Sequence, residues 1–84
     1  MTTPRLRAAA RRTLAVLQAE PGEGWIEMDQ LIARAELRTP DDDLDTRINV
    51  VAAALDQLEA AGYPTEMVRE EAGDFYRIVK ETPA

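Results

Sequence analysis

The feature that most limits how this chain can fold is one long apolar stripe in its middle third. Large aliphatic residues recur there at steps of four, three, four and three, at Leu44, Ile48, Val51, Leu55 and Leu58. Because residues three and four apart share one face of an α-helix, this spacing predicts a helix with a single buried side. A helix cannot bury such a face alone, so the rest of the chain must pack against it.

The residues around the stripe predict where this helix begins and ends. Thr39 is a capping residue, Pro40 suits the first helical position, and Asp42 can return the capping hydrogen bond. Gly62 stands where a left-handed C-terminal cap is expected, and a proline follows shortly after it. The helix is therefore predicted over 40–61.

Two shorter helices and a short strand are predicted ahead of the central helix. The first helix covers 4–19, where Thr3 can cap and Pro4 suits the first helical position. Its inward residues have helical spacing: Leu6, Ala10, Thr13, Leu14 and Leu17. After the break "EPGEG", the pattern predicts a strand over 25–27 and another short helix over 28–35.

A β-hairpin is predicted after the central helix. Residues 65–71 and 75–80 are rich in β-branched, aromatic and alternating residues, and Gly73 between them supplies the positive φ of a tight turn. One face of the hairpin carries Met67, Tyr76 and Ile78, and the other carries Val68, Phe75 and Val79. The alternation leaves open which of these two faces is buried.

A chain of 84 residues makes one domain, 1–84, whose small core must be efficient. Aromatic residues are few, and the only tryptophan, Trp25, is expected to seal the core beside the first strand. The net charge is −6, yet residues 1–19 hold four arginines and no acid. A molecule this acidic repels nucleic acid at long range and attracts basic partners, so any DNA contact must be local.

Several classes of protein are disfavoured by what the sequence lacks. Serine, histidine and cysteine are absent, which removes the commonest nucleophiles and the usual general base, so we expect neither an enzyme nor a cofactor. The lack of cysteine suits a reducing cytoplasm. No window approaches the roughly 20 apolar residues of a membrane span, and a cytoplasmic protein without membrane contact is expected.

The aspartate-rich segment "DDDLD" also invites a metal-binding interpretation. Asp41, Asp43 and Asp45 stand at the first, third and fifth positions of an EF-hand loop. The sixth position, which needs glycine, is Thr46, and the twelfth, which needs glutamate, is Ala52. The segment is therefore predicted to begin a helix and to hold no metal.

The order of these elements resembles that of the winged helix-turn-helix superfamily from about Arg5 to Lys80. The local match is "VVAAALDQLEAAGYPTEMV" leading to "FYRIV", which is similar to the family's third helix, with its leucine, glutamate and glycine before the wing. The resemblance implies an α+β fold with three helices, a short first strand and a C-terminal β-hairpin wing.

The family resemblance also implies a role in binding double-stranded DNA and regulating transcription. The third helix of such proteins usually enters the major groove, where Asn49 and Gln57 could pair with adenine edges. The residues expected to contact DNA are Arg38, Thr46, Arg47, Asn49, Gln57, Arg69, Arg77 and Lys80, with Arg11 and Arg12 of the first helix.

The charge pattern supports a second interpretation, a protein-interaction module. Residues 36–47 hold five acids against two arginines, and residues 65–81 hold five acids against three basic residues. Phosphate contacts normally need the opposite balance. In this alternative, a basic protein partner or a second copy, forming a homodimer, docks at the start of the third helix. The residues concerned are Asp42, Asp43, Val50 and Ala53.

Overall fold

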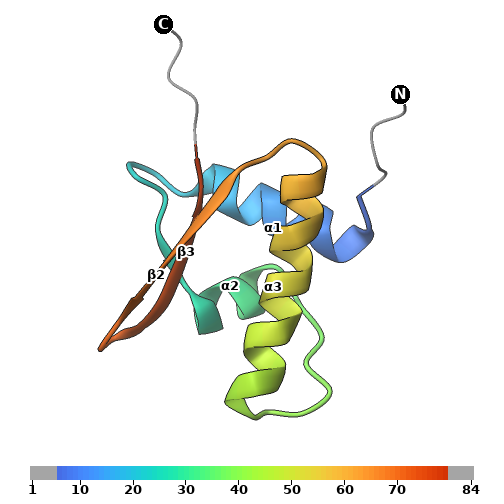
Figure 1. Cartoon of the computed structure of the whole chain (residues 1–84), viewed down its shortest axis with the longest axis vertical. Coiled ribbons are helices and arrows are strands. Elements are labelled where there is room, and N and C mark those ends of the chain that lie inside the picture. The colour runs from blue at the N-terminus through green and yellow to red at the C-terminus, as the bar shows by residue number, and fades with distance from the viewer. Residues whose placement is uncertain (1–5, 80–84) are drawn as a thin grey trace, which may run out of the picture.

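The computed structural model describes residues 6–79 and has an α+β fold, as predicted. Three helices and a three-stranded antiparallel sheet follow one another in the order α1, β1, α2, α3, β2, β3 (Figure 1). Their bounds are Ala8–Ala19, Ile26–Glu27, Met28–Arg34, Leu44–Ala60, Thr65–Glu70 and Gly73–Ile78. None of the helices in this part of the chain is long and apolar enough to cross a membrane.

The sheet has the strand order β1-β3-β2, and the helices pack against one of its faces (Figure 1). The central strand β3 pairs with both neighbours, so that Tyr76 stands opposite Ile26 on one side and Met67 on the other. Tyr76 and Ile78 are buried under the helices. The face left open by the sequence is thereby identified: Tyr76 points inward, and Phe75 lies on the outer side.

The core forms where the three helices meet the sheet. Fully buried side chains come from all three helices: Thr13 and Leu17 of α1, Leu31 of α2, and Val51 and Leu58 of α3. Leu55 is also buried and Ile48 partly so, which confirms most of the apolar stripe. Leu44 is 53% exposed, so its predicted burial was wrong. It is the first residue of α3 and lies beyond the edge of the core.

The start of α3 differs from the prediction. The helix begins at Leu44 and not at Pro40, and its N-cap residue is Asp43, whose backbone is extended and whose side chain makes no capping bond. Thr39 and Pro40 lie in the irregular connection that precedes it. Asp43, the last of the run of three aspartates, therefore occupies the N-cap position, where aspartate is a preferred residue.

The end of α3 has the predicted glycine cap. Gly62 has φ 95°, a conformation that favours glycine. The Tyr63 N–H donates to the Leu58 carbonyl at 2.8 Å, and the Gly62 N–H donates to the Glu59 carbonyl at 3.0 Å. These two bonds form a Schellman motif, which satisfies carbonyls that the helix leaves unpaired. The motif turns the chain sharply toward β2.

The end of α2 has a similar motif without glycine. Glu36 has φ 53°, and the Leu37 N–H donates to the Ile32 carbonyl at 3.0 Å. Arg12 of α1 supports this left-handed turn, since its Nε donates to the Ala35 carbonyl at 2.8 Å and its Nη2 to the Glu36 carbonyl at 3.2 Å. Arg12 therefore joins α1 to the end of α2.

The start of α1 is also later than predicted. The helix begins at Ala8, and the extended backbone of Arg7 is its N-cap. The Arg7 N–H donates to Oε1 of Gln57 on α3 at 3.2 Å, a tertiary contact that local sequence rules do not anticipate. The expected cap at Thr3 and the start at Pro4 lie outside the described residues.

The hairpin turn lies one residue earlier than predicted. Glu70 pairs with Gly73, so the turn consists of Glu71 and Ala72, and β3 spans Gly73–Ile78 and not 75–80. Gly73 has φ 133°, and a Cβ atom there would lie 3.3 Å from Glu27 Oε1. The conformation therefore favours glycine at this position, and an added Cβ would also make the Glu27 side chain shift by a few tenths of an ångström.

Candidate functional site

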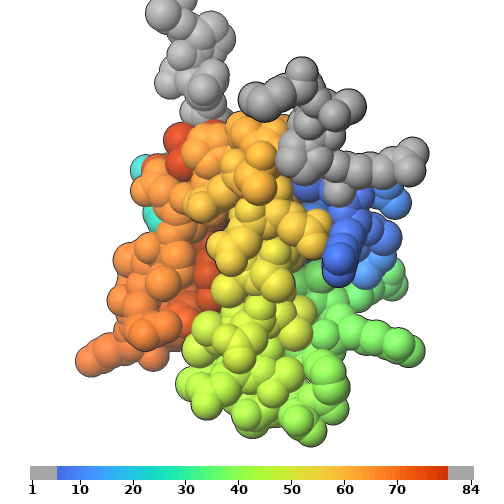
Figure 2. Space-filling model, turned by 45° about the vertical axis from the view of Figure 1, so that its right-hand side comes forward, coloured from blue at the N-terminus to red at the C-terminus, as the bar shows by residue number. Residues whose placement is uncertain are grey.

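A groove separates the hairpin from the N-terminal half of α3, and we call it the α3–hairpin groove. Its volume of about 590 Å³ has room for several side chains. Figure 2 shows the two walls, the hairpin in orange and α3 in yellow to green, on the front of the molecule. The residues that line it are Glu27, Met28, Asp29, Leu44, Asp45, Arg47, Ile48, Arg69, Glu70, Ala72, Gly73 and Asp74.

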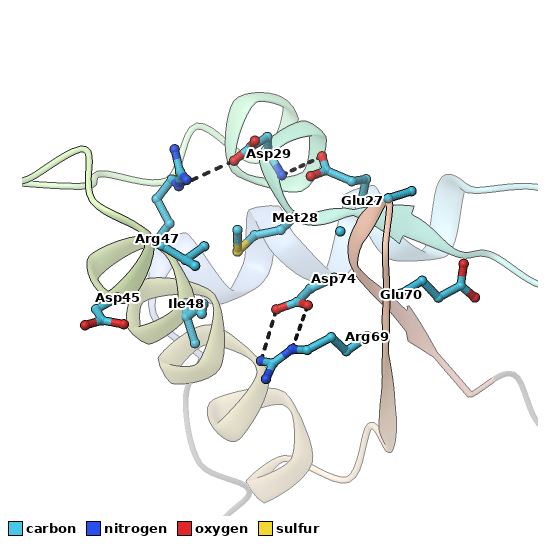
Figure 3. Close-up of a pocket in the computed structure, with 12 residues that line it drawn as sticks. Glu27, Met28, Asp29, Asp45, Arg47, Ile48, Arg69, Glu70 and Asp74 are labelled. Atoms are coloured by element: carbon cyan, nitrogen blue, oxygen red, sulfur yellow. Dashed lines mark hydrogen bonds and ion pairs between the residues drawn. The ribbon is translucent and has the colours of Figure 1, made fainter.

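Apolar side chains from α2 and α3 form one part of the groove. Met28 is buried, Ile48 is partly buried, and Leu44 at the mouth is largely exposed. Figure 3 shows Met28 and Ile48 between the two ion pairs of the groove. The groove can therefore accept the aliphatic part of an incoming side chain as well as a charge.

Arg69 and Asp74 form an ion pair across the hairpin. Arg69 Nε donates to Oδ1 of Asp74 at 2.9 Å, and Nη2 donates to Oδ2 at 3.3 Å. Asp74 is only 7% exposed, and Figure 3 shows Arg69 reaching to it from the neighbouring strand. This hydrogen bonding and the attraction between the charges raise the pKa of Arg69. A phosphate could engage Arg69 fully only by leaving a buried carboxylate unpaired.

Arg47, the second arginine of the groove, is also paired with carboxylates. Its Nε lies 3.6 Å from Oδ1 of Asp29, and its Nη1 lies 3.5 Å from Oδ1 of Asp42. The Nε atom is buried and makes no hydrogen bond. Two of the arginines predicted to contact DNA, Arg47 and Arg69, are therefore brought to one groove, each already beside an acidic side chain.

The groove carries more negative than positive charge. Its lining includes five carboxylates and two guanidinium groups. Glu27 is used as the N-cap of α2, because its Oε2 accepts hydrogen bonds from Asp29 N–H at 2.8 Å and Gln30 N–H at 3.2 Å. Within residues 6–79, Asp45 and Glu70 have no ion-pair partner, and Figure 3 shows them on opposite sides of the groove. The rim is therefore acidic.

The outward face of α3 continues this acidic surface. Its exposed residues are Leu44, Asp45, Asn49, Ala52, Ala53, Asp56, Glu59 and Ala60. Thr46 and Gln57, which were expected on this face, are partly buried. Asp56 and Glu59 belong to this exposed face but were not among the residues predicted for it. The exposed face of α3 has three carboxylates and no cation.

A second groove lies on the other side of α3, and we call it the α1–α3 groove. It brings together five of the residues proposed from the sequence, Arg12, Arg38, Val50, Ala53 and Gln57, and Arg7 lies beside them. Arg12 is occupied at the end of α2. In the described part of the chain, the guanidinium groups of Arg7, Arg11 and Arg38 have neither an ion pair nor a hydrogen bond. The lining of this groove therefore has three arginines against one acid, Glu36.

Arg77 lies on the outer face of the sheet, away from both grooves. Its guanidinium stacks on the Trp25 ring with 4.8 Å to the centroid, and Nη2 donates to Glu66 Oε1 at 2.8 Å. Trp25 is partly buried beneath it and is not part of the buried core, so its expected role in sealing the core was wrong. The remaining proposed DNA contact, Lys80, lies outside the described residues.

Two further observations describe the chemistry of the site. Burial raises the pKa of the Tyr76 phenol, and the negative charge of Asp74 raises it further. Within residues 6–79, no group of three or more acidic side chains is arranged to hold a metal ion. The "DDDLD" aspartates lie in the irregular connection and the first turn of α3.

The chain matches no protein-family model, no curated protein and no solved structure. Function is therefore inferred from the charges and shapes of the α3–hairpin and α1–α3 grooves.

Proposed function

We propose that this chain is a non-catalytic winged-helix module that docks a basic protein segment in the α3–hairpin groove. The observation that carries the proposal is which charged side chains in the groove have ion-pair partners and which do not. Arg47 and Arg69 already have carboxylate partners, whereas Asp45 and Glu70 at the rim have none among the described residues. These charges favour a protein partner over duplex DNA.

Electrostatics oppose the use of α3 as a DNA-reading helix. Duplex DNA is bound largely by cations that replace its counterions. The exposed face of α3 offers Asp45, Asp56 and Glu59 instead, and Arg47 and Arg69 in the α3–hairpin groove are held by acidic side chains. Bringing phosphates to this face would cost repulsion without a compensating contact.

A basic segment fits the same surface well. A lysine or arginine would supply the missing counterion for Asp45 or Glu70, and its aliphatic stem could lie along the exposed Leu44. Complementary charges of this kind speed association and select the partner more than they add affinity. The expected complex is therefore specific and sensitive to salt.

The winged-helix assignment rests on the arrangement of elements. Three helices, a strand before α2 and a hairpin after α3 have the expected order, and the hairpin lies beside α3 (Figure 1). One departure is the connection between α2 and α3, which covers residues 35–43 and is not a tight turn. This longer connection carries three aspartates toward the groove, which favours a basic partner over DNA.

The proposal is tested by titrating the protein with a short fluorescent peptide of alternating arginine and leucine. Asp45→Lys and Glu70→Lys should each weaken binding roughly fivefold, because each removes one exposed ion pair. Asp56→Lys is the matched control, since it makes the same charge change on the same helix outside the groove. Equal losses in all three variants would show attraction by net charge alone and would overturn the proposal.

Duplex DNA is the second candidate partner, because Arg7 and Arg38 line the α1–α3 groove with unpaired guanidinium groups and Arg11 follows Arg7 by one turn of α1. Binding to mixed-sequence duplex at about 50 and 200 mM salt tests it, since a phosphate binder must lose affinity steeply. Arg11→Ala with Arg38→Ala should lower the salt dependence. A protein that fails to bind duplex at the lower salt has no such activity.

A further inference from the structure

The unpaired positive charges of the described chain gather at one edge. Arg34 pairs with Glu20, and Arg47, Arg69 and Arg77 pair with other acids. Three guanidinium groups remain without partners: Arg7 and Arg11, one turn apart at the start of α1, and Arg38 in the connection before α3. We call these three residues the cationic edge.

Unpaired negative charges line the groove on the other side of α3, whereas the α1–α3 groove has one acidic residue, the exposed Glu36. Asp45 and Glu70 are at the rim of the α3–hairpin groove, and the exposed Asp43 and Glu71 are next in sequence to residues that line it. Figure 2 shows α3 running between the hairpin and the blue α1. Because α3 stands between them, the cationic edge and the acidic groove of one molecule cannot neutralise each other.

We propose that the basic partner of the α3–hairpin groove is a second copy of this chain, which inserts its cationic edge. This inference rests on the proposed function and names the occupant of the same groove. Charge complementarity favours a second copy as the partner. The chain itself carries unpaired arginines, whose charge is opposite to that of the groove, beside the apolar Leu37 and Val50. Isologous pairing of two acidic grooves would instead oppose like charges.

Such an association is heterologous, because a different surface of each copy is used. Every added copy brings a new empty groove and a new free edge, so the assembly grows head to tail unless geometry closes it into a ring. Each copy has a net charge of −6, and this repulsion opposes the local attraction. The assembly should therefore be weak and should dissociate as salt screens the contact.

The test is sedimentation velocity of the full chain over a range of protein concentrations at about 50 and 500 mM salt. The average mass should rise with concentration at the lower salt and stay monomeric at the higher salt. Three double variants are compared: a groove variant, Asp45→Lys/Glu70→Lys; an edge variant, Arg11→Glu/Arg38→Glu; and a control, Asp56→Lys/Glu59→Lys. The control has the charge change of the groove variant outside both grooves.

Only head-to-tail contact predicts the following association states for the variants. The groove and edge variants should each remain monomeric, and the control should associate like the unmodified chain. An equal mixture of groove and edge variants should form dimers and nothing larger, because one intact edge meets one intact groove. A groove variant that still associates, or a mixture that stays monomeric, overturns the inference. Matching circular dichroism spectra verify that all variants fold.

Failure of this inference is distinguishable from failure of the proposed function. If the unmodified chain is monomeric at every concentration but its groove binds the arginine–leucine peptide, the partner is another basic protein and only the second-copy assignment is wrong. If neither the peptide nor a second copy binds at the lower salt, both proposals are wrong.

Discussion

The two halves of α3 have opposite surroundings. From the middle of the helix onward, Val51, Leu55 and Leu58 are buried in the core shared with α1, α2 and the sheet. At its N-terminal end, Leu44 and Asp45 are exposed at the α3–hairpin groove. One helix therefore anchors the fold through its later turns and lines the groove with its first turn. Stability and binding should consequently respond to different substitutions along the same helix.

The largest expected effect is a loss of stability from the C-terminal half. Leu58→Ala should lower the free energy of unfolding by about 2–5 kcal/mol, because it leaves a cavity at a fully buried site. Leu44→Ala should lower it by less than about 0.5 kcal/mol, since that side chain is already exposed. Urea unfolding measures both, and similar losses would contradict the contrast between the halves.

A smaller loss is expected at the hairpin wall of the groove. Gly73→Ala should cost about 1–3 kcal/mol, because alanine at φ 133° is strained and its Cβ would press on Glu27, which caps α2. Gly22→Ala is the control, with φ 65° and open space around its Cβ position. Thermal unfolding of the two variants compares them. Equal midpoints would show that contact with Glu27 does not matter.

Breaking the Arg69–Asp74 pair should have an intermediate effect that depends on which partner is removed. Arg69→Met leaves the buried Asp74 carboxylate without its counterion and should destabilise more than Asp74→Asn, which leaves an exposed arginine to water. The double variant should recover part of the loss of Arg69→Met. A double-mutant cycle in urea gives the coupling, and strictly additive losses would show that the pair does not stabilise the hairpin.

The smallest expected effect is on the alkaline stability of the fold. The pKa of Tyr76 is raised in the folded chain by burial and by Asp74, so the unfolded chain loses the phenol proton first. Stability is therefore intact below about pH 10, the ordinary tyrosine value, and falls as the pH rises through the folded value. Tyr76→Phe should flatten this fall in urea midpoints measured between neutral and alkaline pH. A pH profile that is the same in Tyr76→Phe and in the unmodified chain would contradict this role of Tyr76.

The well-packed half of α3 was the more predictable from sequence. The spacing of Val51, Leu55 and Leu58 identified the buried side, and Gly62 identified the end, because a left-handed cap leaves a local signal. The start of the helix was missed, since Thr39 satisfies the same capping rules as Asp43. Local patterns predict elements well where packing and capping agree.

The sequence did not predict which arginines in the groove are paired with acidic side chains. Arg47 and Arg69 look like phosphate contacts in a linear sequence, and only the fold brings Asp29 and Asp74 beside them. The occupation of Arg12 by the carbonyls at the end of α2 is likewise a tertiary contact. The charge count had indicated an acidic surface, but it did not say which arginines remain unpaired.

The account is tested most directly by mapping contacts on the isotope-labelled chain with NMR amide shifts. The arginine–leucine peptide and a mixed-sequence DNA duplex are titrated in separate samples at about 50 mM salt. We expect the peptide to shift the amides of Asp45, Arg47 and Glu70 around the groove, and the duplex to leave them unchanged. Shifts of these groove amides by the duplex, with none by the peptide, would contradict the account.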